Sequence, residues 1–245
     1  MSSQLVKKLK KNLSNVKSRI FDLDEIDSTI ITLINILLII GIFLSYLNYN
    51  AYKEYVAEDG FIEWLTVIAL FISADISIKR FFRLKSKRDF RFLATLVFIA
   101  LLFLFGAGEE ISWGQRIFNI ESQDFFLQHN AQHETNIHNL IFLNIKINKL
   151  VFSFLIGVII VLYFTVITFL YHNNQILKSF IDNHGIPIPR IGHIISLLIF
   201  TIIIEIFPDP GDKWELLEMG ASFIFFLIIV HPLNEEIYNS NSILG

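Results

Sequence analysis

The sequence contains no cysteine, which excludes disulfide bonds, thiolate catalysis and zinc sites built on sulfur. It also lacks internal repeats and low-complexity segments. We expect no signal peptide, because the first 27 residues are too polar to supply its apolar core. The net charge of −3 is too small to indicate a partner. What remains to define the protein is its apolar content.

Hydrophobic residues make up 53% of the 245 positions, 25 residues are phenylalanine, and the mean hydropathy is +0.56. Soluble chains lack repeated apolar runs of about 20 residues. Six such runs predict transmembrane helices at 28–48, 61–80, 92–109, 150–171, 191–207 and 215–232. The fold expected is therefore an all-α integral membrane protein, a bundle of six transmembrane helices.

The basic residues indicate how this bundle is oriented. A basic amphipathic leader (1–27), the loop between spans two and three, and the loop at 172–190 together hold 15 of the 20 Lys and Arg. The positive-inside rule then places both termini of the six-span domain (28–232) in the cytoplasm, including the tail at 233–245. We expect a bacterial inner-membrane location.

Carboxylates gather on the opposite, outer side. Segments 49–63, 109–149 and 205–218 hold 14 Asp and Glu against five Lys and Arg. Asp and Glu contribute little to topology, so this asymmetry is independent of the orientation argument. Four span ends carry these carboxylates at one depth, at Glu63, Glu109, Glu110, Glu205, Glu215 and Glu218.

The longest outer segment, 110–149, joins spans three and four and predicts an interfacial or re-entrant helical element. Ser122 is a candidate N-cap for a first helix. A second helix over 130–142 would place Asn130, Glu134 and His138 in one row on one face.

The string His133-Glu134-x-x-x-His138 does not fit a zinc-protease motif, because its histidines lie five residues apart, about 140° around a helix. A candidate site remains, and it contains Glu134 and His138. Span three would add Glu109 or Glu110, and span six would add Glu218 or, one turn away, Glu215. Glu110, Glu134, His138 and Glu218 would suit one divalent metal ion, Zn, Mn or Fe(II).

Two alternatives to a metal site stay open. Without a cation, some of these carboxyls should hold protons and act as proton donors. In a purely structural network, Arg116 would neutralise one Glu and nearby amides would satisfy the rest. Trp64, Trp113 and Trp214 fall at the same interface, as an aromatic belt does. Asp75, closer to the cytoplasmic end of span two, should pair with Lys79 one turn later.

The strings Gly108-Glu-Glu-Ile-Ser-Trp-Gly-Gln-Arg-Ile-Phe118 and His129-Asn-Ala-Gln-x-Glu-x-Asn-x-His-Asn139 resemble a group of uncharacterised bacterial multi-pass membrane proteins. That resemblance names no reaction. Intramembrane metal hydrolases of the ceramidase type differ, because their His-x-x-x-His near the last span is missing here.

We therefore hold two functional hypotheses. The first is a membrane-embedded hydrolase or transferase acting on a lipid, lipid-linked saccharide or envelope glycan. In this hypothesis, His138 or Glu134 would act as the base or as a metal ligand. Glu109 or Glu110 would act as the acid or as a metal ligand, and Arg116 would bind an anionic headgroup. The second is a non-enzymatic component, either an ion or proton pathway or an assembly subunit. The partners expected are the lipid bilayer and a lipid or lipid-linked substrate, and no nucleic acid.

Overall fold

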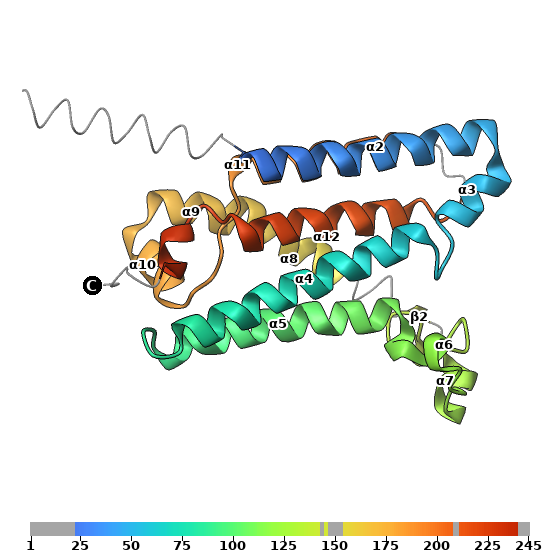
Figure 1. Ribbon diagram of the computed structural model, residues 1–245, viewed down its shortest axis with the longest axis horizontal. Helices are drawn as coiled ribbons and strands as arrows, with labels where there is room; N and C mark the ends of the chain where they lie inside the picture. The colour runs from blue at the N-terminus through green and yellow to red at the C-terminus, as the bar shows by residue number, and fades with distance from the viewer. Residues whose placement is uncertain (1–22, 143–144, 147–153, 208–210, 240–245) are drawn as a thin grey trace, which may run out of the picture.

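A computed structural model describes residues 23–142, 145–146, 154–207 and 211–239 (Figure 1). The described residues form an all-α protein apart from one antiparallel pair of two-residue strands. The long helices are α2 (Glu25–Leu47), α4 (Phe61–Leu84), α5 (Phe90–Glu110), α11 (Ile191–Ile206) and α12 (Trp214–Val230). The shorter elements are α3 (Tyr49–Tyr55), η1 (Ser112–Gly114), α6 (Gln115–Phe118), α7 (Asp124–His129), β1 (Ile141–Phe142), β2 (Ile145–Lys146), α8 (Ile156–Leu162), the π-helical η3 (Tyr163–Ile167), α9 (Thr168–Asn173), α10 (Gln175–Asn183) and η4 (Glu235–Tyr238).

Four helices are long and apolar enough to cross a membrane: α2, α4, α5 and the continuous helix Ile156–Asn173. They correspond to the first four predicted spans. α11 is a shorter apolar helix of 16 residues, and α12 has 17. Large apolar side chains on α2 and α5 face outward, among them Phe43 and Phe98 at 62% and 60% exposure. An apolar surface of this kind is compatible with lipid and would be costly in water.

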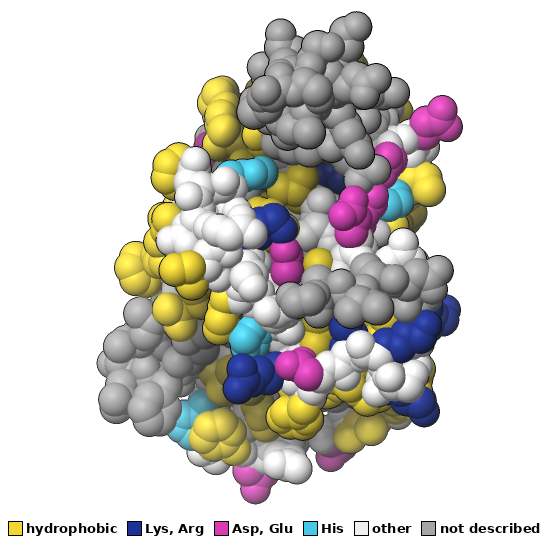
Figure 2. Space-filling model, turned by 90° about the vertical axis from the view of Figure 1, so that its left-hand side faces the viewer, with side chains coloured by type: hydrophobic (Ala, Val, Ile, Leu, Met, Phe, Trp, Pro, Cys, Tyr) yellow, Lys and Arg dark blue, Asp and Glu magenta, His cyan; other side chains and the backbone are white. Residues whose placement is uncertain are grey.

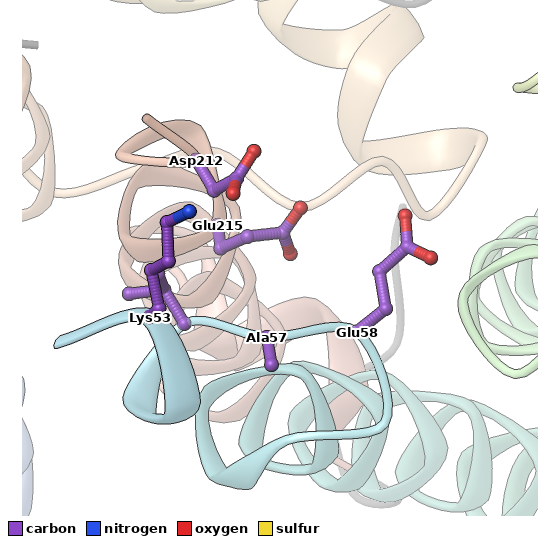
Figure 3. A pocket seen from close by; sticks show the side chains of 6 residues that line it. Lys53, Ala57, Glu58, Asp212 and Glu215 are labelled. Carbon is purple, nitrogen blue, oxygen red and sulfur yellow. The ribbon is translucent and has the colours of Figure 1, made fainter. Parts of the chain in front are cut away.

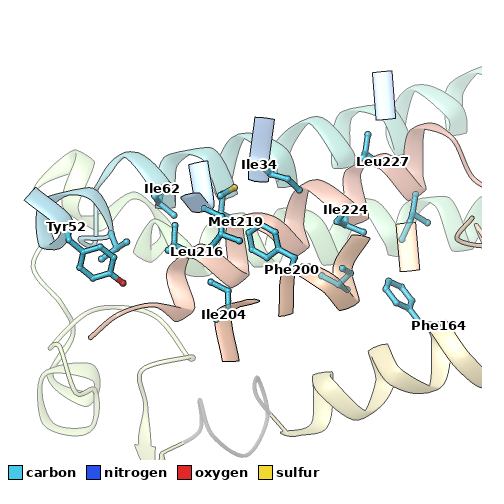
Figure 4. Packing of buried hydrophobic residues seen from close by; sticks show 14 residues of the cluster. Ile34, Tyr52, Ile62, Phe164, Phe200, Ile204, Leu216, Met219, Ile224 and Leu227 are labelled. Atoms are coloured by element: carbon cyan, nitrogen blue, oxygen red, sulfur yellow. The ribbon is translucent and has the colours of Figure 1, made fainter. Parts of the chain in front are cut away.

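α12 is the central helix. It packs against α4, α11 and α2, while α5 packs against the other side of α4. Leu216, Met219 and Ile224 of α12 are fully buried and meet Ile34 of α2 and Phe200 of α11 (Figure 4). This core fills the bundle between its two ends and fixes the positions of the helix termini.

The Phe200 ring also packs against Gly220 of α12. A Cβ at Gly220 would lie 2.4 Å from that ring, so only glycine allows the two helices this approach.

The two ends of the bundle differ. The C-terminal ends of α2 and α5 and the N-terminal ends of α4 and α12 lie together with α3, α6, α7 and β2 at the right of Figure 1. We call this the acidic end, because the predicted outer carboxylates lie there. The other end, shown face-on in Figure 2, carries lysine, arginine, histidine and carboxylate side chains among apolar ones.

Two sequence predictions are settled by the fold. Asp75 and Lys79 do form an exposed ion pair, with Nζ and Oδ2 2.6 Å apart. The prediction of a helix over 130–142 is wrong. The chain forms turns after Asn130, and Asn130 pairs with Leu140 in an antiparallel bridge just before β1. Among the described residues of the segment 110–149 that follow α5, the helical elements are η1, α6 and α7. The N-cap position of α7 is Gln123, whose side chain makes no capping bond, rather than Ser122.

Polar side chains explain why 130–140 is not helical. The Asn130 carboxamide accepts the backbone N–H of Gln132 and of Glu134, and its amide group donates to the carbonyl of Asn136. Such local bonds satisfy the backbone groups that a helix would otherwise pair.

The leader lies mostly outside the described residues, as does the end of the tail. The tail residues 235–238 form η4, and Ile237 and Tyr238 are buried against Leu84 and Phe92. Arg88 Nη2 donates to the carbonyl of Ile237 at 2.6 Å. This part of the tail is therefore packed onto the bundle.

Candidate functional site at the acidic end

Glu109, at the end of α5, organises the turn that follows it in space. Its Oε2 accepts the backbone N–H groups of Ile137 and His138 at 2.6 and 2.9 Å, and its Oε1 accepts the Trp113 indole N–H at 2.8 Å. Glu109 is 2% exposed and lies outside the pocket described below. Its geometry is that of a structural residue, rather than the catalytic residue expected from the sequence.

Trp113 folds back onto the helix that precedes it. A Cβ at Gly108 would lie 3.0 Å from the closest atom of the Trp113 ring. The small residues at the end of α5 thus admit this indole, a close approach that their size permits.

Arg116 is the cation at the centre of the acidic end. Its guanidinium lies within 4.0 Å of four carboxylates. In the α3–α4 turn, Asp59 lies 3.0 Å from Nε and Glu58 lies 3.6 Å from Nη1. Glu63 of α4 lies 3.0 Å from Nη2, and Glu134, in the turn after α7, lies 3.2 Å from Nη1. Nη2 also donates to the carbonyl of Glu110 at 3.1 Å. With its donors directed at protein groups, Arg116 is poorly placed to bind the anionic headgroup expected from the sequence.

Glu134 is held on both oxygens. Oε1 faces Arg116, while Oε2 accepts the Ser112 hydroxyl at 2.5 Å and the Asn136 amide at 3.3 Å. The loss of the predicted helix therefore did not remove Glu134 from the site, because this network brings it there instead.

A small pocket with a cavity volume of about 10 Å³ lies beside these groups, and its lining residues are all polar. It brings together five of the residues predicted for the site, Glu110, Arg116, Glu134, His138 and Glu218. The other lining residues are Glu58, Glu63, Gln132, Asn136 and Glu215.

A wider cavity of about 320 Å³ shares Glu58 and Glu215 with this pocket and is otherwise lined by Lys53, Val56, Ala57 and Asp212 (Figure 3). Because two residues are common to both, the wider cavity adjoins the inner pocket between α3 and the start of α12.

Three carboxylates in the pocket face one another. One oxygen each of Glu110, Glu215 and Glu218 lies within 4.8 Å of the others. Among the described residues, no group donates a hydrogen bond to these side chains and no Lys or Arg nitrogen lies within 4.0 Å of them. At an effective dielectric constant of about 20, each charged pair at this separation repels by about 3 kcal/mol. A cation or bound protons must offset that repulsion.

The pKa values of the pocket residues outside the helices show the effect of burial. Burial lowers the pKa of His138, which favours the neutral imidazole. Burial also raises the pKa of Glu58 above its usual range, although the Gln132 amide and the Arg116 charge oppose this shift. His138 therefore offers a neutral nitrogen base in the same pocket as the three carboxylates.

Strained backbone is concentrated around the same pocket. Within the described ranges, every non-glycine residue with a positive φ lies at the acidic end: Asp59, Ser112, Trp113, Asn119, His133 and Asp212. Sparsely populated backbone conformations cost about 1–3 kcal/mol each and cluster at functional sites. Trp113, at φ 53°, is a bulky residue in a region that mainly glycine and asparagine adopt.

Sequence reasoning missed some of the site. It did not assign partners for Arg116 in the α3–α4 turn, although the string Glu58-Asp-Gly-x-x-Glu63 places three carboxylates there. Ser112 and Asn136 gave no signal, because their contacts depend on the turns of the segment after α5. Glu205, at the same end, does not line the pocket.

The comparisons with known proteins name no relative. The sequence matches no protein-family model, and no curated protein or solved structure is significantly similar to it. The function must therefore be argued from the site.

Proposed function

We propose that this protein is a membrane-embedded enzyme, a divalent-cation-dependent hydrolase or transferase acting on a lipid, lipid-linked saccharide or envelope glycan. Its bundle would have six spans, with α11 and α12 as the last two, and would lie in a bacterial inner membrane with both termini in the cytoplasm. The pocket at the acidic end would then face outward at the level of the outer leaflet.

The observation that carries this proposal is the group formed by Glu110, Glu215 and Glu218. Oxygen ligands from carboxylates suit Mg²⁺ or Mn²⁺, and addition of the nearby His138 would suit Zn²⁺ or Fe²⁺. Glu134, also expected as a ligand, is engaged by Arg116 and Ser112 and is better assigned to positioning. A cation bound by the three carboxylates would polarise a phosphoryl or carbonyl oxygen of the substrate.

His138 is the candidate general base in this proposal. It lines the pocket, and its lowered pKa keeps it neutral and able to accept a proton from an attacking water or hydroxyl. Lys53, on the wall of the adjoining cavity, is the candidate contact for an anionic headgroup in place of Arg116.

The alternative of an ion or proton pathway is less well supported. The hydroxyls of Ser73 and Ser77 on α4 are buried but bond to carbonyls of their own helix, and Asp75 is exposed and paired. The described core that separates the two ends is formed by apolar side chains such as Leu38 and Leu227. A pathway would need polar groups through that region.

The proposal is tested by turnover. The protein would be reconstituted in nanodiscs, supplied with Mn²⁺ and an envelope lipid extract, and the products followed by mass spectrometry. We expect a cation-dependent cleaved or transferred product that is absent with Glu218→Gln and present with Glu205→Gln, a carboxylate at the same end outside the pocket. If wild-type protein and Glu218→Gln give the same products, the enzyme proposal is wrong.

A further inference from the structure

A second polar cluster lies at the end of the bundle opposite the pocket. It joins the start of α2, the start of α11 and the residue after α12, segments that are far apart in the sequence. Its members are Asp24, Asp27, Arg190, His193 and His231. None of them contributes to the proposed function.

Asp27 is the centre of this cluster and is completely buried. Its Oδ1 lies 2.7 Å from Nδ1 of His231, and its Oδ2 lies 3.3 Å from Nε2 of His193. The two oxygens of one carboxylate therefore face two different imidazoles.

Three of these side chains bring possible ligand atoms close together. One atom each of Asp24, Asp27 and His231 lies within 4.8 Å of the other two. The distances from His231 Nδ1 are 2.7 Å to Asp27 Oδ1 and 3.6 Å to Asp24 Oδ2. Ligand atoms about 2.0 Å from a tetrahedral zinc ion are about 3.3 Å apart, so a bound ion would replace the hydrogen bond between His231 and Asp27 and widen that contact.

His193 occupies the position of a residue that orients a metal ligand. It is completely buried, and its Nδ1 has no hydrogen-bond partner among the described residues. A proton on Nδ1 would thus be buried without an acceptor, which favours the tautomer with the proton on Nε2, directed at Asp27 Oδ2. Ligating carboxylates are commonly held by such a hydrogen bond on the oxygen that does not bind the metal.

Arg190 contacts the same oxygen, Asp24 Oδ2, that faces His231. Arg190 Nη1 is 2.9 Å from Asp24 and 3.9 Å from Asp27, and Nη2 of the same side chain is 3.1 Å from Glu235. One guanidinium is thus shared among three carboxylates. Because Asp24 and His231 are partly exposed, an ion could reach the site from solvent.

We propose that Asp24, Asp27 and His231 bind a zinc-type divalent cation, with His193 as the positioning residue for Asp27. The mixed nitrogen and oxygen ligands distinguish this site from the carboxylate group at the acidic end. A bound ion would tie together the ends of α2, α11 and α12. This inference does not depend on the proposed function.

The test uses the full-length protein in detergent, stripped with EDTA and re-equilibrated with ZnCl₂ or CoCl₂. Zinc per chain would be measured by mass spectrometry, and ligand nitrogen by the visible absorption of bound Co²⁺. We expect His231→Gln and Asp24→Asn each to remove about one zinc per chain together with the Co²⁺ absorption. His193→Asn should keep the stoichiometry but weaken zinc binding by about 10- to 100-fold.

Glu218→Gln is the matched control, because it alters the acidic end alone and should leave this zinc in place. The Asp24 side chain is 49% exposed, so Asp24→Asn is expected to fold even if His231→Gln does not. If Asp24→Asn retains the wild-type zinc content, or if Glu218→Gln loses all of the zinc, the second site does not exist.

Discussion

The guanidinium of Arg116 lies 3.0 Å from the carboxylate of Glu63, which joins the segment after α5 to the first turn of α4. Glu63 is only 4% exposed, and it also accepts the backbone N–H of Asp59 at 2.6 Å. This pair therefore fixes the α3–α4 turn against the pocket.

Replacing Arg116 with Met should destabilise the protein strongly. The change removes the charge but keeps most of the side-chain volume, and it leaves Glu63 and Glu134 without their cation. Breaking a buried ion pair from one side costs about 3–5 kcal/mol. The melting temperature in detergent should fall accordingly.

Lys79→Met is the control for that measurement. Lys79 and Asp75 form an ion pair with side chains 75% and 53% exposed, and such pairs contribute about 0–1 kcal/mol. Equal effects of Arg116→Met and Lys79→Met would show that the carboxylates around Arg116 do not depend on it.

Glu109→Gln should loosen the turn at 136–138 without unfolding the helices. Glutamine preserves the shape, but its single carbonyl oxygen cannot replace both carboxylate oxygens that accept from Trp113, Ile137 and His138. Loss of a charge-assisted bond in a buried site costs about 1–3 kcal/mol. Hydrogen exchange should speed up at the amides of Ile137 and His138.

The amide of Phe200, in the buried part of α11, should keep its slow exchange in Glu109→Gln. Unchanged protection at Ile137 and His138 would argue against the structural role assigned to Glu109.

These contacts also show what the sequence could and could not reveal. The first four spans were predictable because each is a continuous apolar run, and the shared depth of Glu110 and Glu218 followed from the outer ends of the third and sixth predicted runs. The turns at 130–140 were not predictable from periodicity, because the acceptor that fixes Ile137 and His138 is Glu109, 28 and 29 residues earlier. The four partners of Arg116 likewise depend on contacts between segments remote in sequence.

Acidification should destabilise the protein in part through His138. Burial holds the folded-state pKa below the ordinary value of 6.5, so between the two values the unfolded chain binds more protons than the folded one. The stability contributed by the neutral imidazole is thus complete above pH 6.5 and is lost as the pH falls below it.

The change that isolates this effect is His138→Asn. The melting temperature of the variant, relative to wild type, should rise as the pH is lowered from 7 to 5. His129→Asn, at an exposed position of α7, provides the comparison. A difference between His138→Asn and wild type that stays constant over this range would contradict the burial of His138.

The proposed orientation can be tested with single cysteines, since the chain has none of its own. Ser122 is buried and bonded to the His133 carbonyl, so the exposed Gln128 of α7 is the better outer position. In intact cells an impermeant maleimide should label Gln128→Cys and leave Ser86→Cys, in the basic loop between α4 and α5, unlabelled. Labelling of Ser86→Cys alone would invert the topology and place the pocket in the cytoplasm.

The claim that the pocket at the acidic end binds a divalent cation is tested most directly by Mn²⁺ titration of metal-free protein with calorimetric and thermal-melting readouts. Wild-type protein and Glu205→Gln should bind Mn²⁺ and melt at higher temperature as it is added. Glu218→Gln should melt no lower than wild type without metal, because one repelling charge is gone, and should gain little from Mn²⁺. A large loss of melting temperature in metal-free Glu218→Gln, with no response to Mn²⁺ in any of the three proteins, would contradict the claim.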